Sequence, residues 1–278
     1  MLRVNNHVIE IGHFPDGTQL IQPPSVSKDN DVVIEWRFEN NEEMVALMFL
    51  ARHYKDKSPA PRMALDMPYI PNARQDRVKH KGDVFTLKYF AEFINSLNFD
   101  LVRVLDPHSH VSEALIKNLK VSPPSGMINY VINEIYEETN NEELIAFFPD
   151  EGAMKRYSSQ AALPYAFGVK MREWETGKIK GLSVIDNGID IKGKNVIIID
   201  DISSRGGTFY HSAKKLKELG ANKIFLYVTH CEKTIFSGEI FKSGLIDKVF
   251  TTDSIFNDAA QQEAISLGIG HKIEVLAI

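Results

Sequence analysis

The sequence of 278 residues predicts an α/β protein whose mainly parallel sheets are flanked by helices. Short apolar segments alternate along the chain with amphipathic segments of helical spacing. The apolar segments are almost continuously hydrophobic, as strands are when helices cover both faces of a parallel sheet. A break containing Pro, Ser and Gly near 121–126 separates two halves of similar rhythm, which predicts two domains, 1–124 and 125–278.

The first half is predicted to alternate strands and helices. Apolar runs predict the strands, and apolar residues at helical spacing predict the helices. The first helix begins with Asn-Glu-Glu, which places two acids where the helix dipole favours negative charge. The strands are expected at 31–36, 62–70 and 101–109, and the helices at 41–55 and 85–98.

The second half repeats this alternation with more apolar strands. The segment 194–200 is the most apolar of the chain, and Gly220 fits the position just after the helix that follows it. Helices are expected at 127–139, 154–161 and 208–219. Strands are expected at 164–170, 194–200, 223–230, 248–254 and 272–278, with a strand and turn over 143–152.

Composition limits the classes of function. The formal net charge is −5, so we expect no overall attraction to nucleic acid or to an anionic membrane. No segment approaches the ~20 apolar residues that span a bilayer, and the N-terminus has no signal-peptide pattern. Cys231 is the single cysteine, which excludes an internal disulfide, and we expect it to be buried and inert. These features predict a cytoplasmic protein.

The stretch NVIIIDDISSRGGTF at 195–209 combines features that suit one ligand. Asp200 and Asp201 end the apolar strand, and adjacent carboxylates there can accept hydrogen bonds from vicinal sugar hydroxyls. Loop 202–207 contains two glycines and leads into a helix at Thr208, so backbone N–H groups and the helix dipole favour an anion. The pattern predicts a ribose 5-phosphate site. An ordinary strand-to-helix turn with a solvated acid pair is the alternative.

The segment VIIIDDISSRGGT resembles the phosphoribosyl-pyrophosphate (PRPP) loop of type I phosphoribosyltransferases and of ribose-phosphate diphosphokinases, the PRPP synthetases. This chain has Ser204 where the usual loop has an acidic residue, and Arg205 where it has Thr. Two interpretations of Arg205 stay open: an extra cation for a phosphate, or rearranged phosphate contacts. Ribose 5-phosphate binding is assigned to Asp200, Asp201, Ser203, Ser204, Arg205, Gly206, Gly207 and Thr208.

The segment PYIPNARQDR at 68–77 distinguishes the two branches of this resemblance. It resembles the PRPP synthetase motif of Pro-Tyr followed by Ala-Arg-Gln-Asp-Arg, which the transferases lack. Arginine side chains can grip phosphate oxygens with a planar fork of donors. The resemblance implies that ATP is bound by Arg74, Gln75, Asp76 and Arg77, whereas a solvated charged loop is the alternative.

Two further strand ends resemble metal- and phosphate-binding segments of the synthetases. VRVLDPHSH at 102–110 resembles the strand that ends in Leu-Asp-Leu-His, which implies that His108 lies near the metal and the triphosphate. FFPDEGAMKRY at 147–157 resembles the Pro-Asp-X-Gly segment, which implies that Asp150 binds a divalent cation and the ribose phosphate. A structural histidine and a helix-capping aspartate are the alternatives.

The segment GVKMRE at 168–173 resembles the Lys-X-Arg at the base of a mobile catalytic loop. The resemblance implies that Lys170 and Arg172, together with His108, are catalytic and stabilise charge on the transferring group. The polar stretch 173–181 that follows has the composition of a flexible flap, or of a solvated run of charges.

The segment HFPDGT at 13–18 resembles the Phe-X-Asp-Gly-Glu hairpin of the synthetases, although Thr18 replaces the glutamate. The resemblance implies that Phe14 stacks on the adenine of ATP and that Asp16 accepts from its amino group, for a site carried mainly by a neighbouring subunit. A homodimer or higher homo-oligomer is therefore expected. A plain Pro-Asp-Gly turn is the alternative.

Taken over most of the chain, the resemblance implies two type I phosphoribosyltransferase-like domains. Domain 1–124 would bind ATP, and domain 125–278 would bind ribose 5-phosphate with its PRPP loop. The implied enzyme transfers the diphosphoryl group of ATP to ribose 5-phosphate, with Mg²⁺ held near His108 and Asp150. Segment 78–85 matches poorly, so weak or absent regulation by ADP and phosphate is expected. A phosphoribosyltransferase and a non-catalytic regulator of true synthetases are the alternatives.

Overall fold

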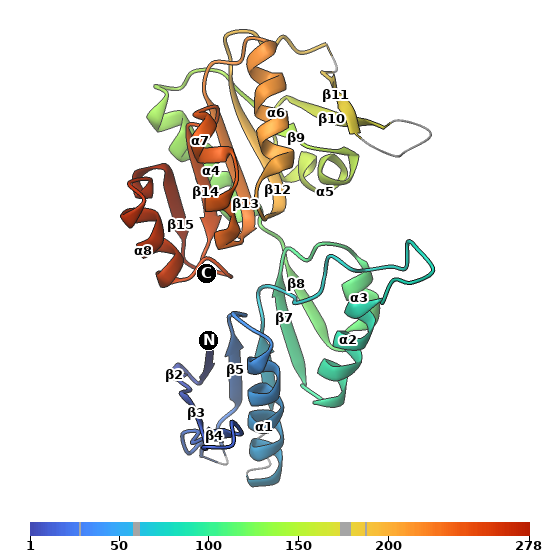
Figure 1. Cartoon of the computed structure of the whole chain (residues 1–278), viewed down its shortest axis with the longest axis vertical. Helices are drawn as coiled ribbons and strands as arrows, with labels where there is room; N and C mark the ends of the chain where they lie inside the picture. The colour runs from blue at the N-terminus through green and yellow to red at the C-terminus, as the bar shows by residue number, and fades with distance from the viewer. Residues whose placement is uncertain (28, 58–61, 173–178, 187) are drawn as a thin grey trace. The chain divides into compact units, whose positions relative to one another are not determined.

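The computed structural model describes residues 1–27, 29–57, 62–172, 179–186 and 188–278, and it describes no side chains for 57, 170–172 and 179–182. The chain divides into two compact units, Met1–Pro123 and Pro124–Ile278. Each unit is an α/β structure built on its own sheet (Figure 1). The predicted fold class is therefore confirmed. In the described part of the chain, no helix has the length and apolar character to cross a membrane.

The first unit contains a six-stranded sheet in the order β2-β1-β5-β6-β7-β8, counted over the described residues. Strands β5 to β8 are parallel to one another, and β1 runs antiparallel to β5. The strands are β1 (Leu2–Val4), β2 (His7–Val8), β5 (Val32–Trp36), β6 (Met63–Asp66), β7 (Leu101–Leu105) and β8 (Leu119–Ser122). The helices are α1 (Glu42–Lys57), α2 (Thr86–Ser96) and α3 (Val111–Leu115).

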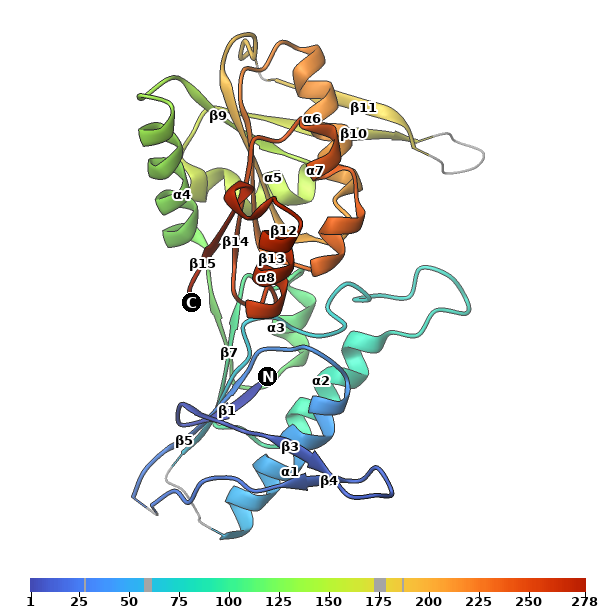
Figure 2. The ribbon, with the colours of Figure 1, turned by 60° about the vertical axis from the view of Figure 1, so that its left-hand side comes forward.

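A separate hairpin of β3 (Ile11–His13) and β4 (Gln19–Ile21) lies beside the first turn of α1 (Figure 2). The Gln19 side chain donates to the Glu42 carbonyl oxygen at 3.0 Å, and the His13 ring contacts the Glu42 carboxylate. The hairpin is therefore attached to the N-terminal end of α1.

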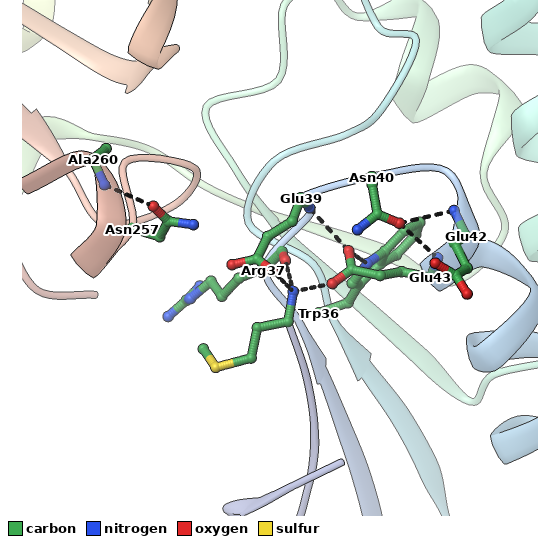
Figure 3. A network of polar contacts seen from close by, with 9 residues as sticks. Trp36, Arg37, Glu39, Asn40, Glu42, Glu43, Asn257 and Ala260 are labelled. Atoms are coloured by element: carbon green, nitrogen blue, oxygen red, sulfur yellow. Dashed lines mark hydrogen bonds and ion pairs between the residues drawn. The ribbon is translucent and has the colours of Figure 1, made fainter. Parts of the chain in front are cut away.

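The start of α1 is fixed by two acceptor side chains (Figure 3). The Asn40 amide oxygen accepts from the N–H groups of Glu42 and Glu43 at 2.9 and 3.3 Å, which satisfies two donors of the first turn. The buried Glu43 carboxylate accepts from the Trp36 indole and from the Glu39 N–H, both at 2.9 Å. These bonds join the end of β5 to α1.

The second unit contains a seven-stranded sheet in the order β11-β10-β9-β12-β13-β14-β15, again over the described residues. Only β11 among these runs antiparallel to its neighbour. The strands are β9 (Leu144–Phe148), β10 (Tyr165–Arg172), β11 (Ile179–Ile185), β12 (Asn195–Ser203), β13 (Ile224–Cys231), β14 (Lys248–Thr252) and β15 (Ile273–Leu276). The helices are α4 (Ser125–Glu138), α5 (Glu151–Ala161), α6 (Gly207–Glu218), α7 (Ile240–Ser243) and α8 (Asp258–Ser266), with short 3₁₀ turns η1 (Lys233–Ser237) and η2 (Gly270–Lys272).

The core of the second unit explains why its strands are so continuously apolar. Along β12, Val196 and Ile198 pack in one hydrophobic cluster with Leu216 of α6, whereas Ile197 and Ile199 pack in a second cluster with helices α4 and α5. Figure 2 shows α4 and α6 on opposite sides of this sheet. Both faces of the strand are thus buried, so no polar side chain is needed until the strand reaches the edge of the sheet.

The predicted elements differ from the structure mainly at their ends. The strand expected at 62–70 stops at Asp66, because Pro68 and Pro71 lack the N–H that a ladder requires. The expected break at 121–126 begins inside β8. Of the expected flap 173–181, residues 173–178 lie outside the described residues and 179–181 belong to β11. Cys231 is buried at the end of β13, as predicted, and burial raises the pKa of its thiol.

Candidate active site

Three neighbouring strands of the second unit bring acidic residues to one edge of the sheet. Strands β9, β12 and β13 are adjacent and parallel, so their carboxyl ends meet at that edge, where α/β proteins bind ligands. Asp150 follows β9, Asp200 and Asp201 lie in the second half of β12, and Glu232 follows β13. The topology therefore unites residues that are separated by as many as eighty positions in the sequence.

The acid pair on β12 lies in surroundings that disfavour a second negative charge. Burial, the carboxylate of Asp201 and the more distant carboxylate of Asp150 hold the pKa of Asp200 well above its ordinary value. Asp201 is buried, and its carboxylate lies 3.8 Å from the Arg156 guanidinium. A pair of carboxyl groups in this state favours ligands that bring hydrogen-bond donors or a cation, and vicinal sugar hydroxyls are such donors.

The loop between β12 and α6 has a conformation that only glycine suits at Gly206. Its φ of 73° lies in the left-handed region, and a Cβ added there would stand 2.1 Å from Cδ1 of Ile240. Gly207 and Thr208 then open α6 and are exposed. The N-terminal N–H groups of α6 and its dipole therefore face outward at the same edge as the acid pair, where they favour an anion.

The hydroxyl groups of this loop are held by the protein itself. The buried Ser203 donates to the Ser204 carbonyl oxygen at 3.3 Å, and the Ser204 hydroxyl donates to the Glu232 carboxylate at 2.5 Å. Arg205 is exposed. The assignment of both serines to ribose 5-phosphate stays a prediction. Because their hydroxyl groups are bonded within the protein, their backbone groups are the candidates for binding that ligand.

Asp150 has the role of a helix cap in the structure. Its Oδ1 accepts the N–H of Ala153 at 3.1 Å, at the start of α5, and a Cβ on Gly152 would stand 3.2 Å from the same oxygen. Its carboxylate nevertheless lies close enough to raise the pKa of Asp200. The predicted role in cation binding is thus compatible with capping, and it stays a prediction.

The predicted catalytic pair Lys170 and Arg172 belongs to β10, but these side chains lie outside the described residues. The backbone places them at the end of a strand that pairs with β9 on one side and with β11 on the other.

In the first unit, the predicted nucleotide segment forms a compact charged group. Asp76 is buried, and Arg77 donates to its two oxygens from Nε and Nη2 at 2.8 and 2.9 Å. Hydrogen bonds from Arg77, reinforced by Ser109 and by the charges of Arg77 and His108, lower the pKa of Asp76 to about 2. The structure thus brings together the end of segment 68–77 and the predicted His108 segment, which follow the neighbouring strands β6 and β7.

The two other residues of that segment are exposed. Arg74 and Gln75 lie on the surface, and the Gln75 side chain accepts from the Thr86 hydroxyl at 2.9 Å, at the start of α2. The predicted hairpin at 13–18 is present between β3 and β4, with Phe14 49% exposed at its tip. The Asp16 carboxylate accepts from the N–H and the hydroxyl of Thr18, and these bonds lower its pKa.

Sequence reasoning missed several residues that shape the site. Arg156 approaches Asp201, and Glu232 holds Ser204. Gly238 packs so closely that a Cβ would stand 1.9 Å from the Arg205 carbonyl oxygen. The position of Glu232 directly after a predicted strand was a usable signal, because the ends of neighbouring parallel strands meet.

The described residues contain no group of three or more His, Cys, Asp and Glu side chains able to hold a metal ion on their own. His108 and Asp150, the two predicted metal residues, belong to different units. Mg²⁺ in proteins is usually held by one or two carboxylates together with substrate phosphates, and Asp150 offers a carboxylate of this kind.

The fold and this site define a class: an α/β protein with two mainly parallel sheets flanked by helices, in which the second sheet carries an acid pair and a glycine-containing loop at the carboxyl ends of its strands. A solved phosphoribosylpyrophosphate synthetase from Mycobacterium smegmatis has the same fold, with a TM-score of 0.76 over 98% of this chain and 86% of that one, at 20% sequence identity. The family described as the phosphoribosyl synthetase-associated domain matches residues 170–273, from the end of β10 into β15.

Within this class, the chain is related in sequence to ribose-phosphate pyrophosphokinases. The pyrophosphokinase of Thermococcus kodakarensis is 29% identical over 247 residues, which cover 87% of this chain and 81% of that protein. The pyrophosphokinase of Saccharolobus solfataricus is 28% identical over 236 residues, which cover 83% and 77%. The resemblance to the PRPP synthetase family, inferred from the motifs, is thus confirmed.

Proposed function

We propose that the protein is a ribose-phosphate pyrophosphokinase, which transfers the diphosphoryl group of ATP to the anomeric hydroxyl of ribose 5-phosphate and yields PRPP and AMP. The observation that carries the proposal is the edge of β12, where the acid pair, the left-handed Gly206 and the start of α6 follow one another. Relatives with this activity match 87% of the chain.

The edge of β12 suits the sugar phosphate in two ways. Asp200 and Asp201 offer acceptors to vicinal hydroxyls, and a carboxylate acceptor forms charge-assisted hydrogen bonds. Backbone N–H groups of residues 203–208 and the dipole of α6 receive the phosphate. We assign Arg205 as an additional cation for this phosphate, since its side chain is exposed next to the loop.

The segment 68–77 suits the nucleotide. Asp76 anchors Arg77 with two hydrogen bonds, so the guanidinium is held in place while its side chain stays 65% exposed. A preorganised cation loses less entropy when it binds a phosphate. Arg74, Gln75 and the exposed ring of Phe14 complete the assignment to ATP, and Phe14 would act in a neighbouring subunit of a homo-oligomer.

In the reaction, the anomeric oxygen forms a bond to the β-phosphorus as the bond from that phosphorus to the α–β bridging oxygen breaks. AMP leaves with that oxygen, and the proton of the anomeric hydroxyl is released. Catalysis of this kind consists mainly of positioning and charge neutralisation. Lys170, Arg172 and His108 are assigned to the charge on the transferring group. Mg²⁺, bound with Asp150 and the phosphates, would neutralise further charge.

The proposal is tested by measuring AMP and PRPP formed from ATP and Mg²⁺, with and without ribose 5-phosphate. We expect AMP in equal amount to PRPP, and only when the sugar is present. The Asp200→Asn variant should lose this activity, whereas Asp56→Asn, an exposed aspartate on α1, should keep it. Release of pyrophosphate that depends on a nucleobase would identify a transferase, and absence of turnover in a protein that binds both substrates would identify a regulator.

A further inference from the structure

The loop between β12 and α6, residues 203–207, is here called the phosphate loop. Segment 232–240, which follows β13, contacts it. The Glu232 N–H donates to the Ser203 carbonyl oxygen at 2.8 Å, and the Glu232 carboxylate accepts the Ser204 hydroxyl at 2.5 Å. Further along, Gly238 packs against the Arg205 carbonyl oxygen and Ile240 against Gly206. Consecutive residues of the loop are thus each contacted by one segment that follows β13.

The Glu232 carboxylate accepts hydrogen bonds from two hydroxyl groups. Glu232 lies directly after β13, the strand next to β12, and one of its donors is the Ser204 hydroxyl of the loop. The Thr234 hydroxyl donates to the same carboxylate oxygen at 3.0 Å. A carboxylate that accepts two hydroxyl groups forms charge-assisted bonds, which hold both donors more firmly than a neutral acceptor would.

We propose that Glu232 is a positioning residue for ribose 5-phosphate, an inference that rests on the proposed function. Through Ser204, Glu232 keeps the loop in the shape that turns its backbone N–H groups and the start of α6 toward the phosphate. It acts as a hydrogen-bond acceptor and not through its charge on the ligand, because a carboxylate beside a phosphate repels it. The Ser204 hydroxyl accordingly stabilises the loop, while the backbone N–H of Ser204 is available to bind the phosphate.

The test is calorimetric titration of the full-length protein with ribose 5-phosphate. Glu232→Ala should bind about tenfold more weakly, the effect of losing one charged hydrogen bond. Glu232→Gln should stay within about threefold of the natural protein, because its amide oxygen also accepts from Ser204. Glu239→Ala is the matched control, since Glu239 lies on the same segment and its exposed carboxylate lies 3.9 Å from the Lys242 ammonium.

Kinetics and a double variant separate positioning from a general loss of structure. Glu232→Ala should raise KM for ribose 5-phosphate about tenfold, with kcat and KM for ATP changed less than about twofold. Ser204→Ala combined with Glu232→Ala should bind no more weakly than the weaker single variant, because both remove one bond. Additive losses, unchanged binding in Glu232→Ala, or a Gln variant as weak as the Ala variant would each overturn the inference.

Hydrogen exchange of the amides at 203–207 gives a readout without any ligand. These amides should exchange faster in Glu232→Ala than in the natural protein and in Glu239→Ala. If the natural protein does not bind ribose 5-phosphate, the proposed function fails, and the exchange rates still decide whether Glu232 holds the loop. Equal exchange in all three proteins would refute the role of Glu232 on its own.

Discussion

Replacement of Gly206 by Ala tests the geometry of the phosphate loop most directly. The φ of 73° costs a residue with a Cβ about 1–2 kcal/mol. The new methyl group would also stand 2.1 Å from Cδ1 and 2.7 Å from Cγ1 of Ile240, and relieving such overpacking typically costs about 1–3 kcal/mol. We therefore expect Gly206→Ala to lower the free energy of unfolding by about 2–5 kcal/mol in urea denaturation.

Gly244 provides the matched control for this substitution. Its φ is 64°, and a Cβ there would meet no atom within 4 Å, so Gly244→Ala should show only the backbone part of the cost, about 1–2 kcal/mol. The steric part should be relieved in part by Ile240→Val, which removes Cδ1 and leaves Cγ1, so the double variant should be more stable than the sum of the single variants implies. If Gly206→Ala costs no more than Gly244→Ala, the close packing of Ile240 against the loop is refuted.

Three further substitutions test the charged groups. Asp200→Asn should raise the free energy of unfolding at pH 7 and abolish binding of ribose 5-phosphate. Because the pKa of Asp200 is raised, the folded protein loses stability as pH rises above the ordinary pKa of 3.8, so the variant should lose less stability than the natural protein between pH 4 and 7. An equal dependence of the unfolding free energy on pH, measured by urea denaturation, would contradict this. For Asp76 the pH dependence of stability has the opposite sign: its pKa of about 2 gives stability that is present above pH 3.8 and is lost as pH falls toward 2. Asp76→Asn should therefore lower the free energy of unfolding by about 1–2 kcal/mol at pH 7, a value reduced for solvent screening because Arg77 is exposed, and by little at pH 2. Lys170→Ala should lower kcat by about 10²–10³ with an unchanged urea midpoint, and a loss confined to KM would argue against a catalytic role.

The fold class could be predicted because the central strands are marked by their own apolar residues. The apolar run that becomes β12 is buried on both faces, so its sequence alone identified a central parallel strand followed by a helix. Strand β8 was harder, because Lys120 and Ser122 interrupt its apolar residues and Pro123 follows directly. Short strands at the edge of a sheet lack the uniform burial that makes a central strand visible.

The site was only partly predictable, for a different reason. Asp200 and Asp201 lie on β12 and Gly206 lies in the loop directly after it, so the local sequence was enough to predict these three residues. Glu232 and Gly238 act on the same loop from some 30 residues away. The position of Glu232 after a strand indicates a strand end, but the sequence does not show which loop lies beside that end. Their role follows from the adjacency of β12 and β13, which is a property of the sheet order.

The dependence of the loop on segment 232–240 has a consequence for protein engineering. If residues 200–208 were transplanted into another parallel sheet, the graft would contain every residue of the motif but would lack the neighbouring residues that hold its backbone. Gly238 and Ile240 leave no spare room beside Arg205 and Gly206, so a recipient with a different chain path after the adjacent strand would force the graft into another shape. The transferable module is therefore a pair of neighbouring strand ends, and its minimal length runs from Asp200 to Ile240.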